Sequence, residues 1–229
     1  MTLEGRILAK KSILCDIFSD EREVEGGNKF TICELGCGPG LPSLTSAAAA
    51  AALKTKVDFQ LIATDVDEFA LDLVNAAAKE QGLDHIVSTR ILDLIQCGSE
   101  DWEEKKNSWM EDVDLFVMSD VFESNAVAIG AARFTQRVLS WPENDLIETN
   151  GQGREYNRRR KSMWVFSQTD RTQREVYLHE LQKLSSELSG GAKDDISSLP
   201  SLDWKLPEAY GLEDRLWLCD VDETMVNYG

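Results

Sequence analysis

An acidic residue followed by three alternating glycines stands at the end of a short apolar run. The run ELGCGPG extends from Glu34 to Gly40, within the longer stretch Phe30–Ala52, which ends in an alanine-rich segment. A strand that passes through a glycine turn into a helix directs several backbone N–H groups at one point, the positive end of the helix dipole. Glycine is needed where a side chain would obstruct the turn or the ligand. The stretch therefore predicts a site for a polar or charged ligand.

The glycine spacing and the charge of the loop limit the classes of ligand that it can bind. A dinucleotide fold favours GxGxxG, but the loop is GxGxG and is followed by Leu41. The loop carries no GxxxxGK[ST] pattern, and it has no lysine or arginine to meet a phosphate. A carboxylate at Glu34 would repel a pyrophosphate and attract an amino group. These features favour a ligand with an amino group over a dinucleotide.

Apolar and amphipathic stretches alternate around this loop, which predicts an α/β fold. We expect a Rossmann-like, doubly wound, mostly parallel seven-stranded sheet with helices on both faces and a C-terminal antiparallel strand pair. Residues 1–229 are expected to form one domain, with 1–29 as a helix and loop covering the sheet and 141–161 as a mobile basic loop. Besides Phe30–Leu35, the predicted strands are 59–63, 86–92, 113–118, 162–167, 202–206 and 215–221, and the predicted helices include 2–18, 68–81, 126–139 and 171–188.

Composition excludes several classes of protein. The chain has 229 residues and a formal net charge of -17, so broad binding to nucleic acid or to an anionic membrane is not expected. A basic protein partner suits this charge better. Five cysteines without a CxxC pair indicate reduced thiols, and two histidines make a histidine-based metal site unexpected, so no metal is predicted. No apolar run is long enough to span a membrane, and we expect a cytoplasmic protein.

The acidic residue and GxGxG together resemble the first motif of the class I S-adenosylmethionine-dependent methyltransferases. The resemblance implies S-adenosyl-L-methionine (SAM) as cofactor and S-adenosyl-L-homocysteine (SAH) as product. It also implies that the cofactor and the acceptor are bound at the carboxyl ends of the strands. The residues that it assigns to the cofactor are Glu34, Gly36, Cys37, Gly38 and Gly40 for the methionine part, Asp65 for the ribose, Val66, Asp93 and Leu94 for the adenine, and Ser119 for the surroundings of the methyl group.

Two further stretches resemble one branch of these enzymes. The segment GLPSL after the glycines and the stretch Val113–Phe122 (VDLFVMSDVF) are similar to the family 16 lysine-methyltransferase-like and nicotinamide N-methyltransferase-like proteins. This similarity implies N-methylation of a lysine in a protein substrate such as a translation factor. Asp120 would guide the lysine ammonium into the site, and Phe122 would wall the channel through a cation–π contact.

Other interpretations remain open at this point. The chain could methylate the nitrogen of a small molecule, or it could be a methyltransferase-like binding subunit without turnover. A dinucleotide-dependent oxidoreductase is a further alternative, against which Leu41 argues. We expect a monomer, with no nucleic acid and no membrane as partner.

Overall fold

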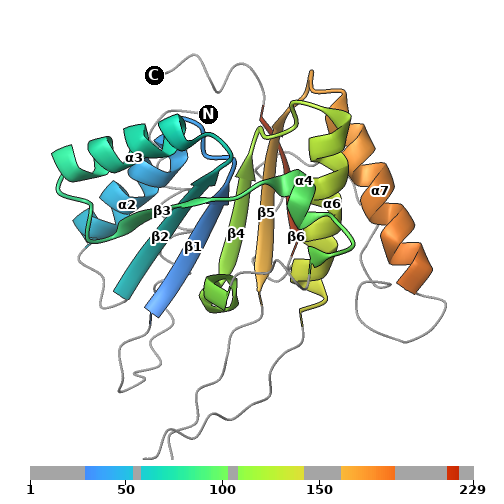
Figure 1. The fold of residues 1–229 in the computed structure, drawn as a ribbon, viewed down its shortest axis with the longest axis horizontal. Coiled ribbons are helices and arrows are strands. Elements are labelled where there is room, and N and C mark those ends of the chain that lie inside the picture. Colours follow the sequence, from blue (N-terminus) through green and yellow to red (C-terminus); the bar gives the residue numbers. More distant parts are fainter. Residues whose placement is uncertain (1–28, 54–57, 103–107, 142–160, 189–215, 222–229) are drawn as a thin grey trace, which may run out of the picture.

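The computed structural model describes residues 29–53, 58–102, 108–141, 161–188 and 216–221, whose centre is a six-stranded sheet (Figure 1). In chain order the strands are β1 (Lys29–Leu35), β2 (Asp58–Asp65), β3 (Val87–Ile91), β4 (Leu115–Ser119), β5 (Ser162–Gln168) and β6 (Leu216–Val221). They lie side by side in the order β3-β2-β1-β4-β5-β6, and every neighbouring pair is parallel. The order reverses between β1 and β4, and ligands of open α/β sheets bind outside the strand ends at such a point.

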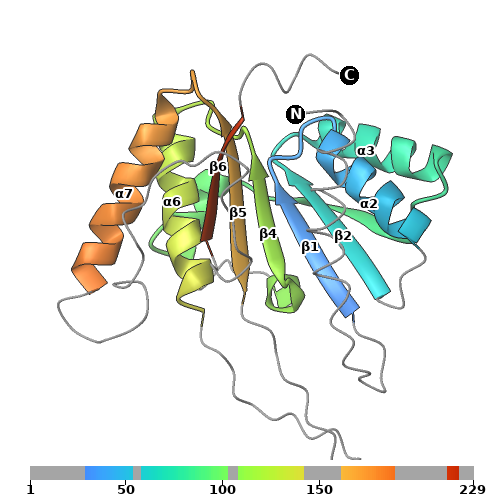
Figure 2. The same ribbon diagram turned by 180° about the vertical axis from the view of Figure 1, so that it is seen from behind.

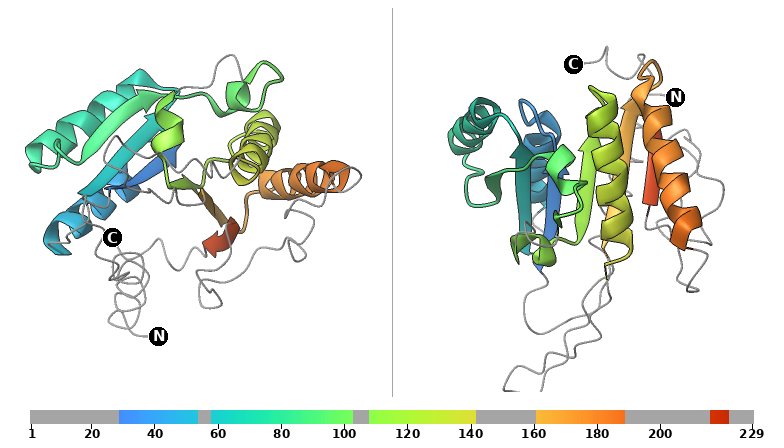
Figure 3. Two further views of the ribbon diagram at one scale, coloured as in Figure 1. Left: turned by 90° about the horizontal axis from the view of Figure 1, so that it is seen from below. Right: turned by 45° about the vertical axis from the view of Figure 1, so that its right-hand side comes forward.

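Helices pack on both faces of the sheet. They are α2 (Leu41–Leu53), α3 (Glu68–Glu80), α4 (Leu94–Cys97), the 3-10 helix η1 (Ser108–Asp112), α6 (Asn125–Leu139) and α7 (Gln173–Leu188). The buried residues of α2 and α3 belong to one hydrophobic core, and those of α4, α6 and α7 belong to a second. Figure 3 shows α2 and α6 on opposite sides of the sheet, and Figure 2 shows the sheet from behind.

Strand β1 connects the two cores through the alternation of its side chains. Ile32 belongs to the core beneath α2 and α3, whereas Cys33 and Leu35 belong to the core beneath α4, α6 and α7. All three side chains are buried, because helices cover both sides of this central strand. The apolar residues of β1 therefore face both sides of the sheet, although the buried polar residues Thr31 and Glu34 interrupt the apolar run.

Polar side chains cap the first turns of two helices. Asp67 caps α3 by accepting a hydrogen bond from the backbone N–H of Phe69 at 2.9 Å. Ser124 caps α6 in the same way through the N–H of Val127. Gly82 follows the end of α3 with a φ of 68°, a conformation in which glycine is favoured.

The parallel α/β sheet with helices on both faces is confirmed, but its C-terminal edge differs from the prediction. The predicted closing strand 215–221 corresponds to β6, which pairs with β5 in parallel rather than antiparallel orientation. Its predicted partner, 202–206, lies outside the described residues, as does the predicted helix 2–18. The described part of the chain therefore contains six of the seven expected strands and no antiparallel pair.

The predicted basic loop 141–161 needs one correction. Residues 142–160 lie outside the described ranges, but Lys161 is described and is buried. Its ammonium group donates hydrogen bonds to the carbonyl oxygens of Met110, Glu111 and Val113 at 2.7 to 3.0 Å. It also lies 4.9 Å from the ring centre of Trp141. Lys161 is therefore a structural residue that holds η1 against the sheet.

None of the helices in the described ranges combines the length and the hydrophobicity needed to cross a membrane.

Candidate functional site

The carboxyl ends of β1 to β4 come together at one edge of the sheet (Figure 1). The N–H of Cys37, just after β1, donates to the carbonyl of Thr64 in β2 at 2.8 Å. The N–H of Leu92, just after β3, donates to the carbonyl of Asp65 at 3.0 Å. On the other side of β1, Leu35 is in register with Met118 of β4. The strand ends that the sequence predicted to carry a ligand are therefore neighbours.

The glycine loop, residues 36–40, has a conformation that only glycine adopts easily. Gly36, Gly38 and Gly40 have φ angles of 64°, 49° and 71°. A Cβ at Gly40 would lie 2.4 Å from a methyl carbon of Val74, and one at Gly36 would lie 2.8 Å from a methyl carbon of Val121. The loop is thus locked against α3 on one side and against the segment after β4 on the other.

Asp65 holds the glycine loop through its carboxylate. One of its oxygens accepts a hydrogen bond from the N–H of Gly38 at 2.8 Å, and the other accepts one from the N–H of Asp67 at 3.0 Å. Each carboxylate oxygen can accept more than one hydrogen bond, so both keep capacity for the hydroxyls of a ribose. The next side chain, Val66, is 66% exposed, which leaves an apolar surface beside this carboxylate. Asp65 and Val66 therefore lie at the end of the second strand, and their roles toward a ligand stay predictions.

Glu34 lies beneath the loop rather than facing the open edge of the sheet. Its side chain is buried, and its carboxylate accepts a hydrogen bond from the hydroxyl of Ser43 in the first turn of α2. Burial raises the pKa of Glu34 to about 7, the hydrogen bonds from Ser43 oppose this rise, and the negative charge of Asp65 adds to it. Glu34 therefore ties the end of β1 to α2, a role that the sequence did not predict.

Cys37 contributes to the loop through its backbone. Its thiol is buried and lies 3.5 Å from the carbonyl oxygen of Gly38, to which it donates. Burial raises the pKa of this thiol to about 12, with smaller contributions from the charges of Glu34 and Asp65. The side chain therefore stays a neutral thiol and is not suited to act as a nucleophile.

The end of β3 differs from the prediction in one residue. Asp93 caps α4, accepting a hydrogen bond from the N–H of Ile95 at 2.9 Å. Leu94, which was predicted to flank the adenine, turns into the core on the side of α6 and is buried. Ile95 is 47% exposed instead, so it is the apolar side chain of α4 that a ligand could contact. The correction follows from the short helix, which reverses the two side chains relative to an extended loop.

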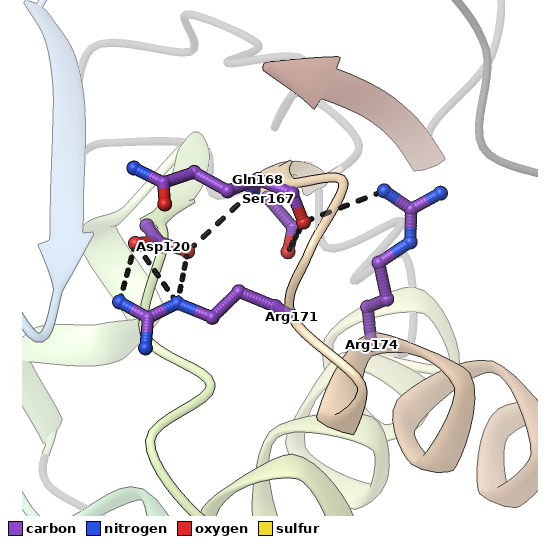
Figure 4. Close-up of polar contacts among 5 residues, drawn as sticks. All are labelled: Asp120, Ser167, Gln168, Arg171 and Arg174. Atoms are coloured by element: carbon purple, nitrogen blue, oxygen red, sulfur yellow. Dashed lines mark hydrogen bonds and ion pairs between the residues drawn. The ribbon is translucent and has the colours of Figure 1, made fainter. Parts of the chain in front are cut away.

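The end of β4 carries the second polar group of the site. Ser119 is the last residue of β4, and Asp120 has a φ of 56°, the only positive φ of a non-glycine residue in the described ranges. The Asp120 N–H donates to the carbonyl of Phe166 at 2.8 Å. Its carboxylate forms a two-pronged ion pair with Arg171, whose closest N–O distance is 2.8 Å (Figure 4). The sequence predicted Asp120 but not its partner Arg171.

Phe122 does not line the site, and its predicted role in catalysis is wrong in this structure. Its ring is fully buried and packs against Tyr177 of α7, with 5.1 Å between the ring centres. A ring without exposed surface cannot contact a substrate. Trp102 is also buried and packs edge-on against Phe134. Both aromatic side chains belong to the core because α6 and α7 cover them.

No protein-family model and no curated protein matches the chain. Solved structures with a similar arrangement include the cyclase SpnF, with 19% identity over 53% of this chain and 40% of that one, at a TM-score of 0.32. They also include geranyl diphosphate C-methyltransferase from Streptomyces coelicolor A3(2), solved with SAH, with 14% identity over 54% and 39% at a TM-score of 0.33. A third is the DszA carbon methyltransferase, with 15% identity over 58% and 34% at a TM-score of 0.38.

This chain spans less than half the length of each of these three proteins. Similarity at these identities and TM-scores carries no argument about the ligand or the reaction. The residues of the chain itself have to supply that argument.

Proposed function

We propose that the protein is a SAM-dependent methyltransferase. The observation that carries the proposal is the hydrogen bond between the Asp65 carboxylate and the N–H of Gly38, in a glycine loop that contains no lysine or arginine. Glu34 adds a second acidic group beneath the same loop. Such a site suits a cofactor with a sulfonium and an ammonium group, whereas it would repel the two phosphates of a dinucleotide.

The loop residues each have a defined part in holding this cofactor. The backbone of residues 36–40 would surround the methionine part, and the Asp65 carboxylate would accept hydrogen bonds from the ribose hydroxyls. Val66 and Ile95 offer exposed apolar surface for the adenine, near the capping carboxylate of Asp93. When bound, SAM supplies an electrophilic methyl group, and the protein contributes alignment and the exclusion of water.

We further propose that the acceptor is an amine, namely a lysine of a protein substrate such as a translation factor. Asp120 supports this proposal, because it places a carboxylate at the end of β4, next to the point where the strand order reverses. The net charge of -17 favours a basic protein over an acidic partner. A small-molecule amine, or a subunit that binds SAM without turnover, would give different results in the second experiment below.

A dinucleotide enzyme remains the second candidate because of one observation. The described strand order β3-β2-β1-β4-β5-β6 with parallel pairing is also that of dinucleotide-binding domains. The strand order is therefore compatible with both SAM and a dinucleotide, and binding has to be measured for both.

Isothermal titration calorimetry with SAM tests the cofactor. We expect the native protein to bind SAM and not NAD, and we expect Asp65→Ala to reduce SAM affinity by about tenfold to a hundredfold, because one or two hydrogen bonds are lost. Asp67→Ala is the matched control, since it removes the neighbouring carboxylate, which caps α3 and does not contact the glycine loop. Asp65→Asn shows whether the charge or the shape of Asp65 matters. An absence of heat with SAM, or tighter binding of NAD, contradicts the proposal.

Methyl transfer from labelled SAM in a cell lysate tests the acceptor. A labelled protein band that survives nuclease treatment, with the label on a lysine in mass spectrometry, supports a protein-lysine methyltransferase. Label only in the small-molecule fraction favours the small-molecule enzyme. Binding of SAM without any transfer favours the subunit without turnover.

A further inference from the structure

Asp120 is held in one position by contacts from the turn between β5 and α7. Arg171 donates to both oxygens of its carboxylate, with Nε at 3.1 and 3.2 Å and Nη2 at 2.8 Å. The N–H of Gln168 lies 3.5 Å from one of the same oxygens. A two-pronged contact between a guanidinium and a carboxylate fixes the orientation of both groups. These three residues, Asp120, Gln168 and Arg171, are called the acceptor cluster below.

The acceptor cluster lies next to the glycine loop. Asp120 precedes Val121, whose side chain is so close to Gly36 that a Cβ there would lie 2.8 Å away. In Figure 4 the side chains of Gln168 and Arg171 extend past Asp120 in the same direction, one above and one below its carboxylate. Both Asp120 and Arg171 keep exposed surface, 24% and 39% of their side chains. The cluster is thus fixed in position and open to a ligand.

Three other charged groups lie around this cluster, namely Asp170, Glu123 and Arg174. The pKa of Arg171 is raised by its hydrogen bond and ion pair with Asp120. The negative charges of Asp170 and Glu123 raise this pKa further. Arg174 points away from Asp120 and donates to the carbonyl of Gln168 at 3.4 Å (Figure 4). Arg171 is therefore the one cation that contacts Asp120 in the described structure, among several anions.

We propose that Arg171 is a positioning residue that makes the acceptor site select the neutral amine over the ammonium ion. This inference rests on the proposed function, and in particular on an amine acceptor. A carboxylate without a cation would stabilise an ammonium ion, which has no lone pair with which to attack a methyl group. Pairing with Arg171 cancels that charge, while the carboxylate oxygens can still accept a hydrogen bond from an N–H of a neutral amine.

The chemistry requires a neutral amine at the moment of methyl transfer. A lysine side chain has an unperturbed pKa of about 10.4, so it is mostly an ammonium ion at neutral pH. In the transfer the nitrogen lone pair forms the N–C bond while the C–S bond breaks, and its electron pair stays on sulfur to give neutral SAH. The nitrogen then carries the positive charge, and the methylated ammonium loses one proton to water. A site that binds only the neutral form aligns the species that can react.

The test measures how amine binding depends on pH, without requiring turnover. The protein loaded with SAH is titrated with Nα-acetyl-lysine methylamide between pH 7 and 9.5, and binding is followed by calorimetry. For selective binding of the neutral amine, the apparent affinity of the native protein should rise about tenfold for each pH unit, as the neutral fraction does below a pKa of about 10.4. Arg171→Gln should bind the ammonium ion as well, so that its affinity changes little with pH.

Two variants separate this role from a purely structural one. Arg171→Lys keeps the positive charge and should keep the pH dependence of the native protein, even where its affinity is lower. Asp120→Asn keeps a residue type that tolerates a positive φ and should weaken amine binding at every pH. Circular dichroism confirms that each variant is folded.

Specific results would overturn the inference. One is an equal pH dependence of Arg171→Gln and the native protein, and another is a native affinity that does not rise with pH. A third is the absence of amine binding to the SAH-loaded native protein. The failure of the protein to bind SAM or SAH would instead count against the proposed function, so the two failures are distinguishable.

Discussion

The glycine loop and the acceptor cluster lie beside each other at one edge of the sheet, but different forces hold them. The loop is fixed by backbone conformation and by buried contacts, as Gly40 against Val74 shows. The acceptor cluster is fixed by an ion pair between two partly exposed side chains, Asp120 and Arg171. In the glycine loop, the contacts that would hold a ligand also contribute to the stability of the fold. In the acceptor cluster, a change of side chain can alter the chemistry of the site while the fold stays intact.

Replacement of a loop glycine gives the largest effect that this comparison predicts. Gly40→Ala should lower the free energy of unfolding by about 2–5 kcal/mol. A positive φ costs a non-glycine residue about 1–2 kcal/mol, and the overlap with the fully buried Val74 adds about 1–3 kcal/mol. Chemical denaturation measures the change, and SAM binding is expected to weaken in parallel.

Gly82→Ala is the matched control for this experiment. Gly82 has nearly the same φ, 68° against 71°, but a Cβ there would meet no atom within 4 Å. Gly82→Ala should therefore lower the free energy of unfolding by only about 1–2 kcal/mol, the contribution of the backbone conformation alone. Equal losses for the two variants would show that close packing does not hold the loop, and the contrast with the acceptor cluster would disappear.

The buried carboxyl of Glu34 predicts an unusual dependence of stability on pH. Its pKa is about 7 in the folded protein and 4.5 as the ordinary value, so the folded state binds the proton more tightly. The stability contributed by the neutral group is complete below pH 4.5, falls as the pH rises, and is lost above about pH 7. The total loss is about 3 kcal/mol, from about 1.4 kcal/mol for each pKa unit.

Glu34→Gln should remove this dependence. At pH 8 the variant should be more stable than the native protein by up to about 3 kcal/mol, and at pH 4.5 the two should be nearly equal. Denaturant unfolding at both pH values measures the difference, with Ser43→Ala as a variant that keeps the carboxyl and removes its hydroxyl donor. A native stability at pH 8 that exceeds that of Glu34→Gln contradicts the assignment.

The same contrast explains what the sequence could predict. The glycine loop is local: its residues are adjacent in the chain, and their types reflect the backbone angles that they adopt. Strands and helices followed from periodicity, whereas Asp65 and Asp120, at the ends of two predicted strands, were assigned through the resemblance to methyltransferases. The pairing of Asp120 with Arg171 joins residues 51 positions apart, and no local pattern indicates it.

The errors have the same origin in tertiary contacts. Phe122 is aromatic and could bind a cation if it were exposed. Its ring is buried because Tyr177 of α7 packs against it. Leu94 was expected beside the adenine, and the short α4 turns it into the core instead. The direction of the Glu34 side chain depends on Ser43 in α2. In each case a partner that is distant in the chain or on another element determines where the side chain points.

The contact between α4 and α6 belongs to neither region, and its replacement should have an effect of intermediate size. A Cβ at Gly130 of α6 would lie 2.4 Å from the carbonyl oxygen of Leu94 and 2.9 Å from the Cα of Ile95. Gly130→Ala should therefore destabilise the protein by about 1–2 kcal/mol, although alanine at an exposed helix position would stabilise it by about 1 kcal/mol. Thermal unfolding shows whether Gly130→Ala lowers or raises the stability of the protein. A stabilising effect would show that α4 can move away from α6 without cost.

The smallest effect is expected for Arg171→Gln, and it tests the comparison most directly. The ion pair with Asp120 is partly exposed, at 39% and 24%, so solvent and salt screen it and its contribution to stability should be under about 1 kcal/mol. Denaturant unfolding at low and high salt measures this, with Arg174→Gln as a control, since Arg174 contacts the same turn without pairing with Asp120. The variant should thus be folded yet altered in amine binding. A loss of stability as large as that of Gly40→Ala would show that the acceptor cluster, like the glycine loop, stabilises the fold. An exposed ion pair cannot contribute so much unless the backbone conformation of Asp120 depends on it.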